Sequence, residues 1–144
     1  MKISTKGRYA LRLMLDLAIY DTGDPISLKD VAKRQKISEK YLEQIISVLN
    51  RGGLVKSVRG AQGGYVLRKK PPDITVGDIL RLTEGDLAPV ACVGKDPEEC
   101  DMKSTCVTIY VWNKLAKAIA DVVDNITLQD LVDESAAKAD TYVI

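Results

Sequence analysis

The chain carries three cysteines, all in one polar stretch, "ACVGKDPEECDMKSTC", at residues 91–106. Cys92, Cys100 and Cys106 are accompanied by no histidine anywhere in the sequence. Thiolates are soft ligands for iron–sulfur clusters and zinc, and three of them on one loop can surround such a cofactor. The spacing matches neither Cys-x2-Cys nor a common ferredoxin pattern. Spacing alone therefore leaves open a cluster, a zinc site, a thiol sensor and incidental cysteines.

Length and composition limit the class of protein that can hold this loop. With 144 residues, of which 46% are hydrophobic, the chain is long enough for one real core and too short for two full domains. It has no uncharged apolar run of about 18 residues, and residues 1–4 lead into a charged amphipathic segment rather than a signal sequence. We expect a soluble cytoplasmic protein with reduced thiols, no disulfide framework and no membrane partner.

The net charge of +1 conceals two oppositely charged halves. Residues 1–72 carry 15 Lys and Arg against 6 Asp and Glu, whereas residues 73–144 carry 6 against 14. An excess of positive charge in one half favours a polyanionic partner such as nucleic acid. Chance segregation of solvated charges is the alternative.

Several helix starts can be read from the sequence. Residues 9–20 have apolar side chains at helical spacing, with Arg8, Arg12 and Asp16 off the apolar stripe. Three stretches share a Ser or Thr followed three residues later by Asp, which is the pattern of a capping box. They place helix starts at Ser27, Thr75 and Thr127. Another helix is predicted over residues 38–51, ended by two glycines.

The first half has the element order of a winged helix-turn-helix. Two short helices are joined by "RQKIS", and "LVKSVRG" and "GYVLRKK" then flank a glycine-rich tip, which predicts a β-hairpin. In this motif the second helix enters the major groove, about 12 Å wide, and the hairpin contacts a neighbouring groove or the backbone. We therefore expect a mainly α fold with a small hairpin, in which Pro71-Pro72 ends a DNA-binding region at residues 1–72.

Polar side chains of helix 38–51 and of the hairpin are the candidate DNA contacts. Glu43 can accept a hydrogen bond from a cytosine amine, and Arg59 suits the negative potential of a minor groove. Lys2, Lys6, Arg8 and Arg12 are candidate phosphate contacts. An ordinary solvated helix face is the alternative. The candidate set is Lys40, Glu43, Gln44, Ser47, Arg51, Lys56, Arg59 and Gly60.

Residues 73–144 are expected to hold a connecting helix, the cysteine loop (86–106) and a long dimerisation helix. The helix is predicted over residues 107–125, with an apolar stripe of roughly five turns. This stripe has more apolar surface than one small domain readily covers. Pairing with a second chain would cover it, and a long intramolecular core helix is the alternative. The stripe consists of Trp112, Leu115, Ile119, Val122 and Ile126.

Four stretches, "KISTKGRYALRLMLDLA", "SEKYLEQIISVLNRGGLVKSVRGAQGGYVL", "VGDILRLTEG" and "NITLQDLV", resemble the iron–sulfur-cluster regulator family of bacterial winged-helix transcription factors. These are the IscR-like regulators, with CymR-like repressors as close relatives, and the resemblance covers nearly the whole chain. It implies a homodimer on a palindromic operator, paired through the long helix. Glu43 falls on a position of site discrimination, Arg59 on the minor-groove arginine of the wing, and Lys40 where a small polar residue contacts a base.

The same resemblance implies that Cys92, Cys100 and Cys106 bind an iron–sulfur cluster, 2Fe–2S rather than 4Fe–4S by preference. IscR-like proteins have a histidine ligand where this chain has Ile109, and nitric-oxide-sensing relatives use a partner-subunit aspartate at the position of Arg8. The fourth ligand stays open between an external thiol, solvent and an oxygen donor of the chain. We expect such a cluster to be labile, so that purified protein can lack it. The oxygen donors are Asp96, Glu98, Glu99, Asp101 and Thr108.

The expected function is that of a sequence-specific DNA-binding transcriptional regulator that senses iron–sulfur or redox status. The alternative is a cofactor-free, CymR-like repressor of sulfur and cysteine metabolism that acts with a protein partner. An enzyme is not expected. The chain has no Cys-x-x-Cys, no phosphate-binding glycine loop after a strand and no histidine to serve as a base.

Overall fold

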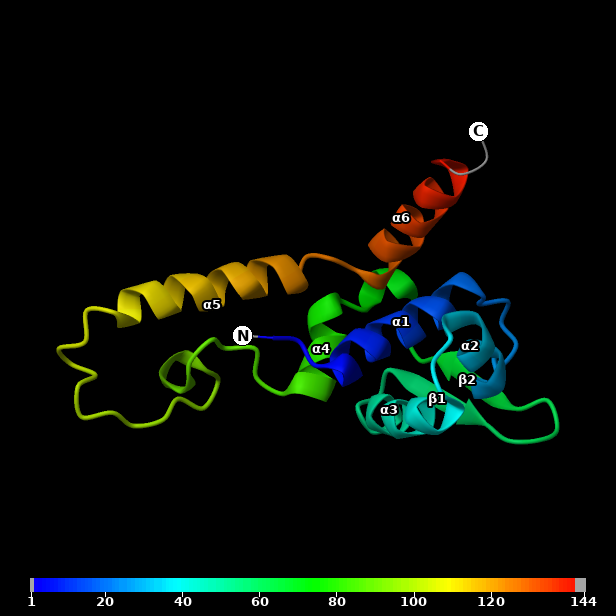
Figure 1. Cartoon of the computed structure of the whole chain (residues 1–144), viewed down its shortest axis with the longest axis horizontal. Helices are drawn as coiled ribbons and strands as arrows, with labels where there is room; N and C mark the ends of the chain where they lie inside the picture. The colour runs from blue at the N-terminus through cyan, green and yellow to red at the C-terminus, as the bar shows by residue number, and fades with distance from the viewer. Residues whose placement is uncertain (1, 142–144) are drawn as a thin grey trace.

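The computed structural model describes residues 2–141 and is mainly α-helical with one hairpin, as the sequence predicts (Figure 1). Met1 and residues 142–144, which end the two predicted regions, lie outside the described residues. The helices are α1 (Thr5–Ile19), α2 (Leu28–Gln35), α3 (Glu39–Arg51), α4 (Val76–Glu84), α5 (Ile109–Val123) and α6 (Leu128–Thr141). Strands β1 (Val55–Val58) and β2 (Gly64–Leu67) pair antiparallel, and two short 3-10 turns are η1 (Pro71–Asp73) and η2 (Ala91–Val93).

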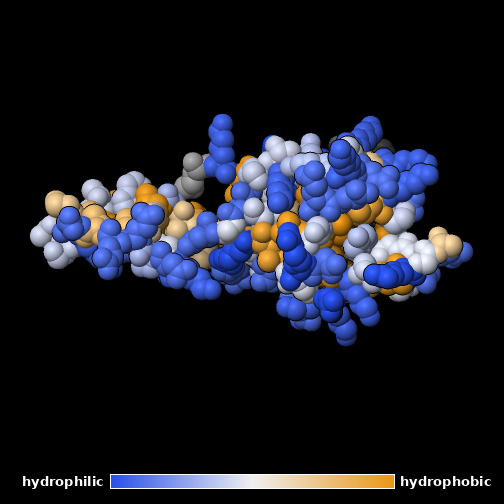
Figure 2. Space-filling view, turned by 90° about the horizontal axis from the view of Figure 1, so that it is seen from below, coloured by the Kyte–Doolittle hydropathy of each residue, from blue (hydrophilic) through white to orange (hydrophobic). Residues whose placement is uncertain are grey.

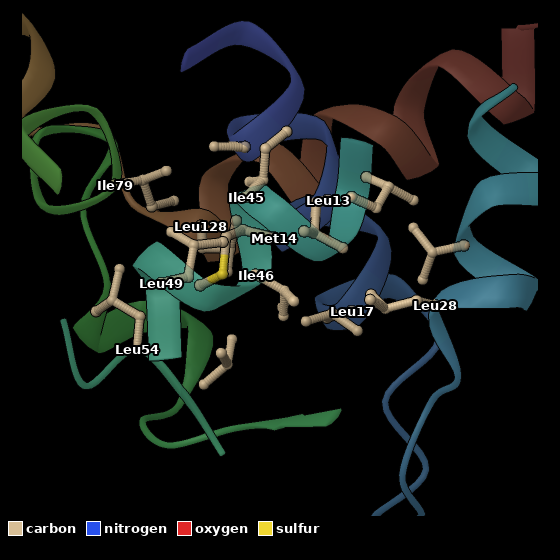
Figure 3. Close-up of a cluster of buried hydrophobic side chains, with 14 of the residues drawn as sticks. Leu13, Met14, Leu17, Leu28, Ile45, Ile46, Leu49, Leu54, Ile79 and Leu128 are labelled. Atoms are coloured by element: carbon tan, nitrogen blue, oxygen red, sulfur yellow. The ribbon is translucent and has the colours of Figure 1, made fainter. Parts of the chain in front are cut away.

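One hydrophobic core joins both halves of the chain (Figure 3). Leu13, Met14 and Leu17 of α1 pack with the apolar side of α3, and Ile79 of α4 and Leu128 of α6 belong to the same cluster. Burial of one such aliphatic side chain stabilises the fold by about 1.5–3 kcal/mol. The core therefore fixes α3 on α1 and also holds α4 and α6 against the first half of the chain.

Side-chain caps define where most helices begin. The hydroxyls of Ser27, Ser38, Thr75 and Thr127 each accept a backbone N–H three residues on, which confirms the predicted starts. At Thr75 the box is reciprocal, since the Thr75 amide donates to Asp78 at 2.9 Å. Helix α1 begins earlier than predicted, because Ser4 caps it by accepting from the Gly7 amide.

The long C-terminal helix is shorter than predicted. Helix α5 ends at Val123, and Ile126 lies beyond it, with its carbonyl accepting a hydrogen bond from the Val76 amide at 2.9 Å. The chain has left the helix there because Thr127, which caps α6, pairs with Thr75 in an antiparallel bridge. In Figure 1, α5 and the cysteine loop form an arm that extends away from the body.

The prediction that Asp16 lies off the buried stripe of α1 is wrong. Asp16 is 1% exposed and is the buried charged residue of the described core. Its carboxylate accepts hydrogen bonds from Arg34 and Gln35 at the end of α2. Burial of a carboxylate is tolerated because each oxygen has a donor.

Candidate nucleic-acid interface and cysteine loop

Helix α3 separates an apolar side from a polar one. Its apolar side, which includes Leu42, Ile45 and Leu49, is fully buried against α1 and the rest of the core. The opposite side is exposed and forms part of a largely hydrophilic face of the molecule (Figure 2). That side carries the five predicted contacts of this helix, Lys40, Glu43, Gln44, Ser47 and Arg51.

The turn between α2 and α3 is held from α1. Lys36 ends α2 in the left-handed conformation, with φ of 56°. Just before it, the Gln35 carbonyl accepts from Arg12 Nη2 at 2.5 Å, and Gln35 Oε1 accepts from Arg12 Nε at 3.2 Å. The guanidinium of Arg12, a candidate phosphate contact, is thus engaged within the chain. It ties the end of α2 to α1.

The hairpin is anchored to the linker between α1 and α2. Ile26 and Tyr65 exchange two backbone hydrogen bonds, of 3.0 and 2.8 Å, which add the linker to the edge of β2. Gly64 allows this approach because a Cβ there would overlap the Ile26 backbone. At the tip, Arg59 is exposed and Gly60 has φ of 121°, a conformation that favours glycine.

Helix α3 and the hairpin are neighbours in the chain and in space. Gly52-Gly53 follows the end of α3, and the Leu54 amide donates a hydrogen bond to the Leu49 carbonyl at 3.1 Å. Strand β1 therefore starts beside the C-terminal end of α3. The remaining predicted contact, Lys56, is exposed on this strand. All eight predicted DNA contacts lie on exposed surface of this α3 and hairpin unit.

The cysteine loop places its three thiols in different settings. Cys92 lies half-buried in η2, Cys100 is exposed, and Cys106 is half-buried just before α5. Within residues 2–141, no group of three or more Cys, Asp, Glu or His side chains is close enough to hold a metal ion. The structure thus keeps the predicted ligands on one loop without gathering them into a site.

The chemistry of the thiols nevertheless fits a soft metal. The pKa of Cys106 lies below its usual value because the thiolate is hydrogen-bonded by the Thr108 hydroxyl, at 3.3 Å, and by the Ile109 amide at the start of α5. A thiolate is the form that binds iron or zinc. Three cysteine sulfurs suit an iron–sulfur cluster, whereas Ile109 and Arg8 supply no ligand. The acidic side chains of the loop, Asp96, Glu98, Glu99 and Asp101, are exposed.

Two functional relationships were not predicted from the sequence. The contact of Asp16 with Arg34 and Gln35 joins residues far apart in the chain, and only the placement of a carboxylate next to an apolar stripe hinted at it. The contacts of Asp86 within the cysteine loop had no motif to mark them.

In the described part of the chain, no helix has the length and apolarity needed to cross a bilayer.

Known proteins with a similar sequence are transcriptional regulators. The chain is 43% identical to the HTH-type transcriptional regulator CymR of Bacillus subtilis over 143 residues, covering 99% of this chain and 98% of CymR. It is 41% identical over 133 residues to the HTH-type transcriptional regulator IscR of Pectobacterium atrosepticum, covering 92% and 80% of the two chains.

Solved structures give the same relationship. The structure of CymR, described as the global cysteine regulator of B. subtilis, has a TM-score of 0.79 over 93% of this chain and 98% of CymR. That of IscR from T. potens has a TM-score of 0.76 at 47% identity over 94% and 88%. The model of the Rrf2 family, "Iron-dependent Transcriptional regulator", matches residues 3–134. With this fold and these relatives, the chain belongs to the Rrf2 family of transcriptional regulators.

Proposed function

We propose that this regulator binds a palindromic operator as a homodimer and that thiolate ligation in its cysteine loop changes its affinity for that operator. Residues 1–72 are the DNA-binding region in this proposal, and residues 73–144 are the sensing and pairing region. In each half-site, α3 enters the major groove and Arg59 of the wing enters a minor groove. Phosphate contacts from the other basic side chains supply affinity without sequence information.

The exposed polar side of α3 is the observation that carries the DNA-binding part. A helix that buries one side in the core and presents Lys40, Glu43 and Gln44 on the other has the shape and chemistry to read base edges. Arg59 lies on the hairpin that follows it directly. One rigid unit therefore offers both a helix and a guanidinium to the same duplex.

Exposed apolar side chains on α5 support pairing of two chains. Val111, Leu115, Ala118 and Val122 follow one another at steps of four, three and four residues and so share one side of the helix. Val111 and Val122 are 50% and 56% exposed in the single chain. A second copy would cover this side, whereas Ile119 lines a cavity with Leu80 of the helix's own subunit.

The donor set supports an iron–sulfur cluster held by Cys92, Cys100 and Cys106. The low pKa of Cys106 favours its thiolate, and the IscR relatives make a cluster the first choice of cofactor. The choice between 2Fe–2S and 4Fe–4S depends on the fourth ligand. When bound, the cluster would supply redox and oxidant sensitivity. The chain's own part is to present the three thiolates from one loop.

A cofactor-free repressor that acts with a protein partner is the second candidate. It is favoured by the 43% identity to CymR over almost the full length of both chains, and by thiols that lie apart on the loop. In that case the cysteines would have no shared ligand. Regulation of sulfur and cysteine metabolism would follow the CymR relative.

One experiment separates the two candidates. The protein is purified without oxygen, its visible spectrum and its iron and sulfide content are measured, and operator binding is followed by fluorescence anisotropy. A cluster sensor should absorb in the visible range, and its operator affinity should differ from that of the Cys92→Ala, Cys100→Ala, Cys106→Ala triple variant. Allosteric coupling of about 1–3 kcal/mol would appear as a difference of roughly 5- to 150-fold. Equal affinities would contradict the sensor, and weak, salt-independent attachment to every duplex would contradict the DNA-binding proposal itself.

A further inference from the structure

The first arm of the cysteine loop is folded around the carboxylate of Asp86. Asp86 Oδ1 accepts a hydrogen bond from the Ala88 amide at 2.9 Å, and Oδ2 accepts one from the Lys95 amide at 2.7 Å. The second bond spans nine residues and closes residues 86–95 into a ring that contains Cys92. The ring is therefore held by hydrogen bonds to a charged group, which are stronger than those between neutral groups.

A glycine at position 94 makes room for this closure. Gly94 lies so close to Asp86 that a Cβ at position 94 would overlap Oδ2. Further along, the Glu98 amide donates to the Ala91 carbonyl at 3.3 Å, which draws the next residues back over the ring. A side chain at Gly94 would thus push away the carboxylate that holds the arm.

The closed ring also rests against α5. The η2 turn, which contains Cys92, contacts this helix, and Val93 lines a small cavity together with Ala116 and Ile119. The segment around Cys100 differs, because its described backbone hydrogen bonds are local turns such as Lys103 N to Cys100 O at 3.1 Å. The Cys92 thiol is therefore held near α5, while the Cys100 thiol lies on an exposed segment.

We propose that Asp86 is the positioning residue of the cysteine loop, and that it holds Cys92 against α5 before any ligand binds. Cys106 lies just before the same helix, where its sulfur contacts the Thr108 hydroxyl at 3.3 Å, so two of the three thiols lie beside α5. Cys100 lies between them in the chain and moves to complete the thiolate set. This inference rests on the proposed thiolate site, to which it adds the residue that prepares it.

The first test measures thiol accessibility in the full-length, reduced, metal-free protein. Each cysteine's rate of alkylation by iodoacetamide is followed by peptide mass spectrometry. In the wild type, Cys92 should react more slowly than Cys100. Asp86→Ala should raise the alkylation rate of Cys92 roughly tenfold, which is the scale expected for loss of hydrogen bonds to a charged group. The alkylation rate of Cys100 should not change. Asp86→Asn, which keeps one acceptor oxygen, should give an intermediate rate.

The control is Asp140→Asn, which neutralises an exposed carboxylate on α6, away from the loop. It should leave the Cys92 rate at the wild-type value. The loop lies outside the hydrophobic core, so the thermal midpoint of Asp86→Ala should stay close to that of the wild type. An unchanged Cys92 rate in Asp86→Ala, or an equal acceleration of Cys92 and Cys100, would overturn the proposal.

The second test uses Co²⁺ as a probe, because thiolate-to-cobalt charge-transfer absorption reports thiolate ligation directly. Asp86→Ala should bind Co²⁺ roughly tenfold more weakly than the wild type, by the same loss of hydrogen bonding, and Asp140→Asn should bind it as the wild type does. Equal binding by wild type and Asp86→Ala would contradict a positioning role. If the wild type itself shows no charge-transfer band, the thiolate site fails, and the alkylation rates still decide whether Asp86 holds Cys92.

Discussion

Arg34 and Asp16 form a two-contact ion pair that joins α2 to α1, with Nε to Oδ2 at 3.0 Å and Nη2 to Oδ1 at 2.7 Å. The Asp16 side chain is fully buried, whereas that of Arg34 is 30% exposed and stacks on the Tyr20 ring. The pKa of Arg34 is raised, first of all by its hydrogen bond to Asp16. This pair therefore ties α2, the helix before α3, to the buried side of α1.

Replacement of Asp16 by Ala should destabilise the fold. Two bonds to a guanidinium and one to Gln35 would be lost, and Arg34 would keep a half-covered charge without its partner. Loss of one partner of a buried pair costs about 3–5 kcal/mol, and the partial exposure of Arg34 reduces this to about 2–4 kcal/mol. Urea unfolding measures the change. Asp24→Ala, which removes an exposed carboxylate, is the control, and a loss no larger than in that control would refute the role of the pair.

Arg59→Ala should weaken operator binding by about 1–3 kcal/mol if its guanidinium enters a minor groove. Arg59 is exposed at the hairpin tip, so its removal should leave the fold unchanged. Fluorescence anisotropy on the operator at several salt concentrations measures the effect. Lys138→Ala removes one positive charge from exposed surface of α6 and should have far less effect. Equal losses in the two variants would mean that only net charge matters.

Glu43→Ala should change which sequences are bound more than how tightly the protein binds. A carboxylate that accepts from a cytosine amine rejects other bases by about 1–3 kcal/mol, and it repels phosphates when no such amine is present. The variant should therefore tolerate substitutions at one base pair of each half-site. Competition among singly substituted operators tests this. The control is Glu39→Ala, an exposed acid in the first turn of the same helix, and an identical preference profile in wild type and Glu43→Ala would exclude base reading.

The ion pair between Arg81 and Asp124 should make the junction of α4 and α5 sensitive to acid. The pKa of Asp124 lies below its usual value because Arg81 donates two hydrogen bonds to it, at 2.5 and 3.0 Å. A carboxylate with a depressed pKa stabilises the fold above its unfolded-state pKa, and this stabilisation is lost as pH falls through the folded-state pKa. The effect is modest, since the two side chains are 41% and 42% exposed.

Urea unfolding of wild type and Asp124→Asn across a pH series checks this sign. The free energies of unfolding should differ near neutral pH and converge in acid. Asp140→Asn, at the exposed end of α6, should give no such pH-dependent difference. A gap between wild type and Asp124→Asn that persists or widens in acid would contradict the assigned pKa direction.

Local sequence signals predicted the fold well. The features that the sequence did not predict depend on contacts between residues that are distant in the chain. The capping hydroxyls at Ser27, Ser38, Thr75 and Thr127 act on amides three residues away, so the sequence alone reveals them. The pairing of Asp16 with Arg34 depends on how α1 and α2 cross, which periodicity does not specify. The exposure of the predicted α3 contacts follows from amphipathicity, whereas the hold of Asp86 on Lys95 depends on the path of an irregular loop.

The proposed dimer can be tested by introducing one charged side chain at a time on the exposed apolar side of α5. Val111 and Val122 lie about three turns apart on the same side of the helix, so Val111→Asp or Val122→Asp would place a carboxylate in the proposed interface. Burial of an unpaired charge is costly enough to raise the dimer dissociation constant by at least roughly 100-fold. Sedimentation velocity over a range of concentrations measures this. Asn113→Asp adds the same charge on the exposed polar side of the helix and should leave the dimer intact. If both valine variants stay dimeric, pairing uses another surface, and because each half-site needs one subunit, the two reading helices would then have a different spacing on DNA.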